Sequence, residues 1–351
     1  MFKSYFSSEE IKSYGALTNL TLSDRSDGKT LDIKASGFVS YLKDKSQFVY
    51  LRRWKSELSC DLYETFYNEL IDKVEKNEYV GYPEVYEIIN YEFLGTKRGV
   101  YIRKKGDKNW DLICYFMPLT MTGKKKSSLD ITRIKKIEYD EFVPLDSRYI
   151  PNEMHLLIEF YKSVDRDRDT TLLNLYGNRI DNFNPFFDFF DIHLGIEKEK
   201  IRLYKNGTIA VQIYMNKEHR EERKKSRFNS MIENTSYENY NNGGVLNNAL
   251  IKIGNTNGCF YFASFKSSLG EGCIFYNEKQ IVISSKKRKD GSLIVDKIYN
   301  TGRDEYLVTY GNIPNFIKDR VKRGNIYYDN EKTYHIFEPL LHKIGGIRWV
   351  I

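Results

Sequence analysis

The N-terminal part of the chain alternates short apolar runs with helical patterns. A brief apolar stretch leads into a loop of small and polar residues, LTLSDRSDGKT (20–30). An amphipathic helix is predicted next, because apolar residues recur there at three- and four-residue spacing. Its apolar positions are Leu31, Ala35, Phe38, Val39 and Leu42. Residues 48–51, FVYL, then predict a buried strand. Strand, loop, helix and strand in this order predict an α/β domain with a parallel sheet.

The pattern changes twice farther along the chain. Residues 61–78 have a helical pattern, whereas short β-like runs separated by glycines dominate 83–121 and predict an inserted antiparallel hairpin region. A strand is predicted within 134–144. A helix is predicted from Pro151, a residue suited to a first helical turn, and a buried strand then ends at Asn178.

The C-terminal third reads as a linker and a second domain. KEHREERKKSR (217–227) is a charged helical stretch, and the segment after it is polar and rich in Asn and Gly. From residue 249 onward, short strands with turn signals and two late helices predict a small α+β domain. We therefore predict a first domain over 1–212, a partly helical linker over 213–242 and a second domain over 243–351.

Composition and charge fit a two-domain protein with an anionic partner and no membrane span. The chain has 351 residues, 41% of them hydrophobic, and a net charge of +7. Residues 243–351 carry 16 Lys and Arg against 10 Asp and Glu, a net charge of +6, which favours contact with nucleic acid. No run approaches the roughly 20 apolar residues that span a bilayer. The four cysteines are scattered, so neither a zinc site nor a disulfide framework is expected, and a reducing cytosol fits.

The loop SDRSDGKT (23–30) has the order of a phosphate-binding loop. Small residues let backbone N–H groups face an anion, and the following helix adds favourable dipole charge. Lys29 would reach the β- and γ-phosphates, and Thr30 would hold Mg²⁺. The match to GxxxxGK[ST] is imperfect, and an ordinary strand–turn–helix is the alternative. The predicted ATP-binding residues are Ser23, Asp24, Arg25, Ser26, Asp27, Gly28, Lys29 and Thr30.

A second motif lies in IKKIEYDEFVP (134–144). A strand that ends in Asp-Glu has the Walker B form, in which Asp140 holds the Mg²⁺ shell and Glu141 polarises the attacking water. A central parallel strand should be nearly all apolar, yet Lys135, Lys136 and Glu138 interrupt this one. A solvent-facing strand with a charged end is therefore the alternative.

Two segments with candidate polar residues follow the second motif. The helix after Pro151 ends in DRDRD (165–169). Arg166 and Arg168 are either part of a solvated helix end or a source of an arginine aimed at a neighbouring subunit's phosphates. Asn178 ends a strand, and a polar residue there can sense the γ-phosphate if the strand lies beside the phosphate site.

Four segments together resemble the DNA-packaging ATPases of phi29-type tailed bacteriophages, which are terminase-like motors. They are SDRSDGKT, QFVYLRRWKSEL, YDEF followed by YIPNE, and RDRD with LYGN and NPFFDFF. Their order and spacing match from about Leu20 to the C-terminus. The resemblance implies a P-loop NTPase domain of the ASCE type with a RecA-like parallel sheet. It also implies a small α+β RNase H-like second domain, a vestigial nuclease that binds nucleic acid.

The resemblance assigns the nucleotide pocket residue by residue. Lys29 matches the phosphate-binding lysine, and Thr30 matches the hydroxyl that holds Mg²⁺. Asp140 matches the metal-binding Walker B aspartate, and Glu141 matches the catalytic glutamate. Asn178 matches the sensor at the end of a strand.

The resemblance also assigns groups outside the subunit's own pocket. Arg166 matches the catalytic arginine that such motors insert into the next subunit's site, and Lys126 falls at a basic position that also acts in trans. Lys55 lies in a loop that faces the DNA channel in this family. The exposed basic loop with Lys124 and Lys125 is a second candidate for DNA contact.

Two departures from the family pattern bear on activity. Family members carry glycine where this chain has Ser23 and Ser26, and a serine held at positive φ is strained by roughly 1–3 kcal/mol. An RNase H-type nuclease needs several carboxylates around two metals, the first on its opening strand. The opening strand CFYFASF has none, and Glu271 and Glu278 form no matched set, so no nuclease activity is expected.

The resemblance implies an ATP-driven translocase that packages double-stranded DNA into a procapsid, with ATP and Mg²⁺ as cofactors. The expected partners are DNA, the portal protein, a structural packaging RNA and identical subunits in a ring, a pentamer by family resemblance. The expected location is the host cytoplasm and, transiently, the portal vertex. A terminase with an active nuclease and a non-catalytic nucleotide-binding ring subunit are the alternatives.

Overall fold

The computed structural model divides into two compact units. Met1–Ile180 with Ile192–Val245 form the N-terminal unit, and Asp181–Asp191 with Leu246–Ile351 form the C-terminal unit; each is described by itself. The structure describes residues 5–125, 129–144, 149–150, 152–178, 185–192, 201–233, 252–267, 270–286, 293–295, 307–308, 315–322, 325–330, 332–334, 336–337 and 340.

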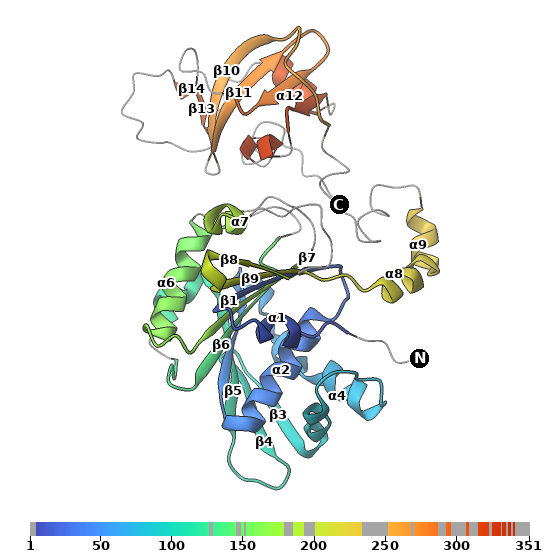
Figure 1. Ribbon diagram of the computed structural model, residues 1–351, viewed down its shortest axis with the longest axis vertical. Coiled ribbons are helices and arrows are strands. Elements are labelled where there is room, and N and C mark those ends of the chain that lie inside the picture. Colours follow the sequence, from blue (N-terminus) through green and yellow to red (C-terminus); the bar gives the residue numbers. More distant parts are fainter. Residues whose placement is uncertain are drawn as a thin grey trace. The chain divides into compact units, whose positions relative to one another are not determined.

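The N-terminal unit is built on one nine-stranded sheet in the order β3-β4-β5-β2-β6-β7-β1-β9-β8 (Figure 1). Its strands are β1 (Thr18–Ser23), β2 (Gln47–Arg52), β3 (Tyr91–Gly95), β4 (Gly99–Lys104), β5 (Asp111–Pro118), β6 (Ile134–Asp140), β7 (Leu172–Asn178), β8 (Ile201–Tyr204) and β9 (Ile209–Ile213). The six strands from β5 to β9 in this order pair in parallel. The strand of the phosphate loop, β1, is separated from the Walker B strand, β6, by β7, which is the arrangement of an ASCE-type sheet.

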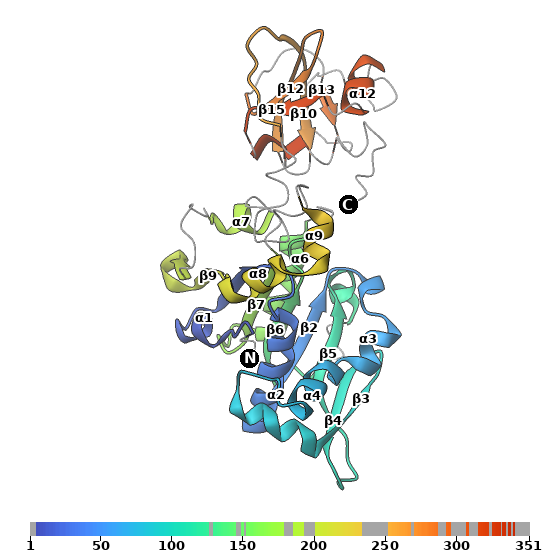
Figure 2. The same ribbon diagram turned by 90° about the vertical axis from the view of Figure 1, so that its right-hand side faces the viewer.

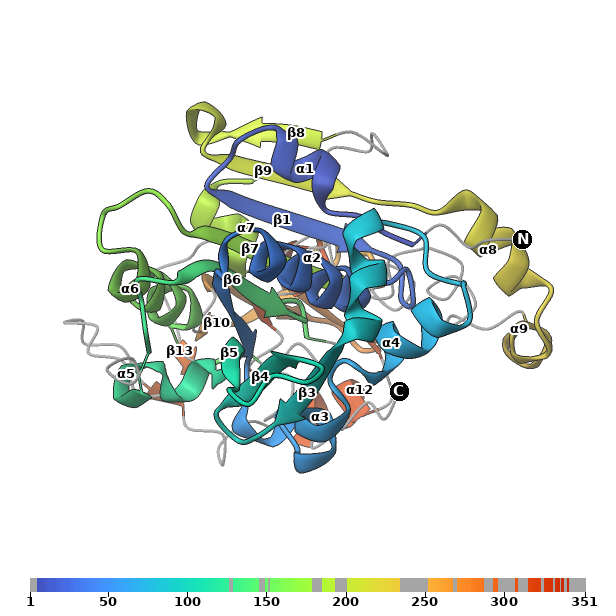
Figure 3. The same ribbon diagram turned by 90° about the horizontal axis from the view of Figure 1, so that it is seen from below.

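Helices cover both faces of this sheet, and the longest one follows the phosphate loop. In Figure 3, α2 and α4 lie on one face and α6 on the other. The α-helices are α1 (Glu9–Ser13), α2 (Lys29–Asp44), α3 (Cys60–Thr65), α4 (Asn68–Glu75), α5 (Thr122–Lys125), α6 (Glu153–Asp165), α8 (Lys217–Lys224) and α9 (Arg227–Ile232). The short 3₁₀ turns include η1 (Lys55–Glu57) and η2 (Pro83–Asn90). The α/β fold is therefore confirmed, and the predicted helix after the loop is α2.

The β-like runs of 83–121 form antiparallel strands at one edge of the main sheet. β3 pairs with β4 and β4 with β5 in antiparallel fashion, but β5 also pairs with β2 in parallel. These strands therefore extend the edge of the main sheet. The predicted antiparallel pairing is therefore confirmed, and β5 joins this region to the parallel sheet.

The Walker B strand lies in the centre of the sheet despite its charged residues. Glu138 is 0% exposed, and neither carboxylate oxygen makes a hydrogen bond of normal geometry in the described part of the chain, although the Tyr176 hydroxyl lies close enough to interact with it. Lys136 reaches past the sheet to α2, where its Nζ donates to Ser36 O at 3.0 Å and Ser40 Oγ at 2.6 Å. The alternative of a solvent-facing strand is wrong, since the lysine finds partners on the covering helix.

Replacing Glu138 with methionine should stabilise the N-terminal unit. A buried polar group without hydrogen bonds costs about 1–3 kcal/mol, and methionine of similar size removes that cost. We therefore expect the free energy of unfolding, measured with urea, to rise in Glu138→Met. Lys136→Met, which deletes a cation that has two partners, should lower it. A less stable Glu138→Met would show that water or a shifted side chain satisfies this carboxylate.

The C-terminal unit contains a six-stranded sheet in the order β14-β13-β10-β11-β12-β15 (Figure 2). Its elements are α7 (Pro185–Phe190), β10 (Phe260–Ser267), β11 (Gly270–Tyr276), β12 (Ile281–Ser284), β13 (Leu293–Val295), β14 (Leu307–Val308), α12 (Asn315–Lys322) and β15 (Ile326–Tyr328). β10, β11 and β12 are antiparallel, and β13 and β14 continue in parallel beside β10. Three antiparallel strands extended in this way form an RNase H-like sheet. Within the described residues, no helix has the length and apolarity that a membrane span requires.

Candidate functional site

The phosphate loop joins the end of β1 to the start of α2. Asp27 is 1% exposed, and its Oδ2 accepts the Asp24 amide at 3.0 Å, so its carboxylate turns back into the loop. Gly28 has a φ of +95°, and a Cβ there would stand 2.9 Å from Tyr5 Cδ1. Only glycine fits this position, because the backbone is left-handed and the space is filled. Arg25 at the tip is exposed.

The two serines that replace family glycines have different backbones. Ser26 is exposed and has a φ of +67°. Ser23 is the last residue of β1, and its backbone is not in the left-handed conformation. The expected strain therefore arises at Ser26, where a left-handed L-residue costs roughly 1–2 kcal/mol. Ser23 instead contributes a polar group, because its Oγ accepts from Lys29 Nζ at 2.7 Å.

Lys29 is the central cation of the site. Its Nζ also donates to Asp24 O at 2.9 Å and to Asn178 Oδ1 at 3.0 Å, so the loop and the end of β7 meet at this ammonium. Lys29 is 7% exposed. Burial lowers its pKa to about 8, against the opposing pull of nearby carboxylates, of which Asp27 and Asp140 are the strongest. A bound triphosphate would supply negative charge beside Lys29 and so favour its protonated form.

Triphosphate binding should therefore weaken as pH rises above about 8. The free protein loses the Lys29 proton near that pH, whereas a bound polyanion favours the charged form, so binding above pH 8 takes up a proton. Calorimetry in buffers of different ionisation enthalpy should find almost no proton uptake near pH 6.5 and an uptake approaching one near pH 9. Lys136 also has a pKa of about 8 through burial, but it contacts α2 away from the loop. Lys136→Met should keep this pH dependence, and its loss in that variant would contradict the assignment to Lys29.

Asp140, at the end of β6, collects three donors. Its Oδ2 accepts from Thr30 Oγ1 at 2.9 Å and from the Tyr50 hydroxyl at 2.8 Å, and its Oδ1 accepts the Glu141 amide at 3.1 Å. Burial raises the pKa of Tyr50 well above its usual value, so this phenol remains a donor. A hydroxyl and a carboxylate side by side are the hard oxygen ligands that Mg²⁺ accepts. Thr30 and Asp140 therefore fit the metal role predicted for them.

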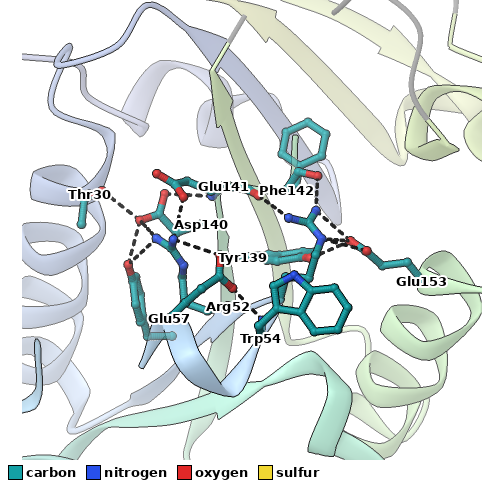
Figure 4. A network of polar contacts seen from close by, with 11 residues as sticks. Thr30, Arg52, Trp54, Glu57, Tyr139, Asp140, Glu141, Phe142 and Glu153 are labelled. Carbon is teal, nitrogen blue, oxygen red and sulfur yellow. Dashed lines mark hydrogen bonds and ion pairs between the residues drawn. The ribbon is translucent and has the colours of Figure 1, made fainter. Parts of the chain in front are cut away.

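Glu141 is held by a cation that the sequence analysis did not single out. It follows β6 in a left-handed conformation, φ +58°, and its side chain is 49% exposed. Arg52, at the end of β2, donates to Glu141 Oε2 at 2.6 Å and lies 3.5 Å from Asp140 Oδ2 (Figure 4). Its third carboxylate contact is Glu57 at 3.4 Å. One guanidinium thus contacts both Walker B carboxylates.

The next residue, Arg53, anchors the opposite face of the sheet. It is 2% exposed and pairs with Glu153 on α6, with Nε to Oε2 at 2.8 Å. It also donates to the carbonyl oxygens of Glu141 at 3.1 Å and Phe142 at 2.6 Å, which fixes the chain just after β6 (Figure 4). Successive strand residues point to opposite faces. The pair Arg-Arg at the end of a buried strand was therefore the sequence signal for both roles.

The two arginines of DRDRD, Arg166 and Arg168, differ in their contacts and in their exposure. Arg168 closes the end of α6, donating to Asp165 O at 2.8 Å, Val164 O at 2.9 Å and Ile131 O at 2.8 Å. Arg166 caps the same helix with a φ of +52° and has an exposed side chain. It lies at the end of the sheet where β7 begins, away from the phosphate loop of its own subunit. This position excludes a role at its own phosphate loop and fits both predictions for Arg166, a solvated helix end and an arginine offered to a neighbouring subunit.

The predicted basic residues are placed in part. Lys55 is exposed and begins η1, three residues after Arg52. Lys124 and Lys125 belong to α5, but their side chains lie outside the described part, as does the whole of Lys126. In the C-terminal unit, β10 carries no carboxylate along its length, and Glu271 on β11 lies opposite Lys266.

Comparison with known proteins places the chain in a family. A family model described as Podovirus DNA encapsidation protein (Gp16) matches residues 1–315. The DNA packaging protein of Bacillus phage phi29 is 26% identical over 235 residues, which cover 66% of this chain and 63% of that protein. Its counterpart from Bacillus phage B103 is 27% identical over 227 residues, 64% of this chain and 63% of that protein. The matched part thus spans less than two thirds of the length of these relatives.

Two solved structures show the same fold. A chain of the bacteriophage Phi-29 viral genome packaging motor assembly has a TM-score of 0.62 and 19% identity, covering 97% of this chain and 100% of that one. A chain of the Phi-28 gp11 DNA packaging motor has a TM-score of 0.56 and 17% identity, covering 97% and 98%. Since the family model covers nearly nine tenths of its residues, this chain belongs to the Podovirus DNA encapsidation protein (Gp16) family.

Proposed function

We propose that this protein is an ATP-driven translocase that packages double-stranded DNA into a viral procapsid. The observation that carries the proposal is the meeting of six groups at one end of the sheet. Lys29 lies between Ser23 and Asn178, Thr30 bonds Asp140, and Glu141 follows directly. This set can bind a triphosphate and activate water, and the relatives are named DNA packaging proteins.

The residues divide the work of hydrolysis among them. The loop amides and Lys29 bind the β- and γ-phosphates, and Asn178 senses the γ-phosphate through Lys29. Glu141 orients water for in-line attack and accepts its proton. Thr30 and Asp140 would hold Mg²⁺, which neutralises charge on the phosphates when bound. Arg166 of the next subunit stabilises the charge that develops on the γ-phosphate.

The contact between Arg52 and Glu141 supports control of the base. The Arg52 guanidinium occupies Glu141 Oε2 at 2.6 Å, so Glu141 has to leave Arg52 before this oxygen can contact the attacking water. Arg52 is followed by Arg53, Trp54 and Lys55, and Glu57 accepts the Trp54 amide at 2.6 Å (Figure 4). The segment that would grip DNA is thus continuous with the residue that restrains the base.

The proposed partners follow from charge and from the family. Lys55, Lys124 and Lys125 would contact DNA phosphates, so grip should be insensitive to sequence and weakened by salt. Subunits would form a ring, a pentamer by family resemblance, that docks on the portal at the procapsid vertex in the host cytoplasm. A structural packaging RNA would bind the basic C-terminal unit.

A test of this function measures ATP turnover per subunit against protein concentration, with and without double-stranded DNA. A motor whose catalytic arginine comes from a neighbour should turn over faster per subunit as rings assemble and when DNA is present. A rate independent of both would contradict the proposal. ATP binding without turnover, even with portal-bearing procapsids, would favour a non-catalytic ring subunit.

The alternative with nuclease activity is tested separately. The full chain should leave supercoiled plasmid intact in the presence of Mn²⁺, because β10 offers no carboxylate for a two-metal site. Nicking that persists through purification would favour a terminase that also cleaves DNA.

A further inference from the structure

A strap formed by residues 5–8 crosses the phosphate loop. The Phe6 amide donates to Asp27 O at 2.8 Å, and the Ser8 amide donates to Asp32 Oδ1 at 3.1 Å. These bonds tie the strap to the end of the loop and to the first turn of α2. None of the motifs in the sequence called attention to this segment, yet it is bonded directly to the part of the loop that binds phosphate.

Two tyrosines from separate segments border the loop at this crossing. Tyr5 packs against Gly28, and its hydroxyl accepts from Lys73 Nζ at 2.7 Å, which fixes the position of the ring. Tyr214 directly follows β9 and meets Phe6 edge-on, with ring centroids 5.1 Å apart. Phe6 is 3% exposed, whereas both tyrosines remain partly exposed. A buried aromatic ring thus supports a partly open aromatic border.

The order of the strands decides which side of the loop a nucleobase can occupy. Toward β7, β6 and β2, the border of the loop is charged, with Asp140, Glu141 and Arg52, and it serves the γ-phosphate. The base lies at the other end of a nucleotide from the γ-phosphate. β9 flanks β1 on the opposite side, and there the border is aromatic.

We infer that Tyr5 and Tyr214 form a ledge on which the base of the bound nucleotide stacks, an inference that rests on the proposed ATPase function. An aromatic side chain holds a base through its π face, and every base has one. The ledge therefore selects nucleoside triphosphates over bare polyphosphate, and it discriminates little between ATP and GTP.

The test compares ligands that share phosphates but differ in the base. Calorimetry on the full-length protein should measure the affinity of ATP, GTP and inorganic tripolyphosphate for the parent, Tyr5→Ala and Tyr214→Ala. We expect each variant to lose about 10-fold in affinity for both ATP and GTP. The affinity for tripolyphosphate should stay within about 2-fold. Tyr5→Phe, which keeps the ring and loses the bond that positions it, should lose less affinity for ATP than Tyr5→Ala.

The control is Tyr14→Ala, the same substitution at a tyrosine that is 48% exposed at the end of α1. It should leave all three affinities unchanged. Equal losses for ATP and tripolyphosphate in Tyr5→Ala and Tyr214→Ala would overturn the ledge, since the rings would then only support the loop. Unchanged affinities in both variants would overturn it as well. A parent that binds none of the three ligands would overturn the nucleotide site itself, a result distinct from failure of the ledge alone.

Discussion

Arg166→Ala should abolish ATP turnover in assembled rings while ATP affinity stays within a few-fold of the parent. Its side chain is exposed and away from its own phosphate loop, so binding does not depend on it. An arginine that stabilises the transition state from a neighbour contributes about 10³–10⁵ in rate. Phosphate release and equilibrium ATP binding, measured on the same preparation, check both halves of this prediction. Alanine keeps the left-handed backbone no worse than arginine, since both carry a Cβ.

A matched control and a mixing experiment test whether Arg166 acts on the neighbouring subunit. Asp167→Ala changes the next residue, which is also exposed with a φ of +56°, and should keep turnover. Mixing Arg166→Ala with Glu141→Gln subunits should restore part of the activity. In such rings, an intact Glu141 can meet an intact Arg166 across an interface. Two inactive variants that remain inactive when mixed would show that Arg166 acts within its own subunit or not at all.

Glu141→Gln should lower ATP turnover by about 10²–10⁴ and leave ATP binding nearly unchanged. Glutamine fills the same space and cannot accept the proton of the attacking water. Steady-state phosphate release compared with ATP affinity gives the measurement. The substitution also removes the ion pair between Glu141 and Arg52. A control variant must therefore remove another carboxylate charge beside Arg52 and leave Glu141 intact.

Glu57→Gln supplies that variant. Glu57 is the other glutamate in contact with Arg52, at 3.4 Å, and it is the last residue of η1, away from β6 in the sequence. Turnover should stay within a few-fold of the parent in Glu57→Gln. If the two variants lose activity equally, the charge balance of Arg52 governs the rate, and Glu141 is not the base.

The parallel sheet and the nucleotide pocket could be predicted from the sequence because local patterns determine them. The phosphate loop needs a glycine at Gly28, a lysine and a hydroxyl before an amphipathic helix, and all of these are consecutive. The Walker B residues follow a strand directly. Asn178 required one more step, since it meets Lys29 only because β7 lies beside β1.

The features that were missed depend on contacts between distant segments. Glu138 looks like a surface residue in its own strand, and only the position of β6 under α2 makes it buried. Arg52 and Arg53 are adjacent in sequence, yet each pairs most closely with a carboxylate about 90 to 100 residues away, on opposite faces of the sheet. Tyr5 belongs to no sequence motif. Its role follows from its contact with Gly28, which lies 23 residues farther along the chain.

The position of β7 has a consequence for timing around a ring. Its residues rise about 20 Å from Leu172 to Asn178. Arg166 lies six residues before its first residue, and Asn178 at its far end bonds Lys29. β7 and the short segment before it therefore connect the arginine offered to one neighbour's ATP to the sensor of the subunit's own ATP. If Arg166 acts as proposed, loss of the γ-phosphate from one subunit shifts Arg166 in the adjacent site. ATP hydrolysis then passes in one rotational direction from subunit to subunit.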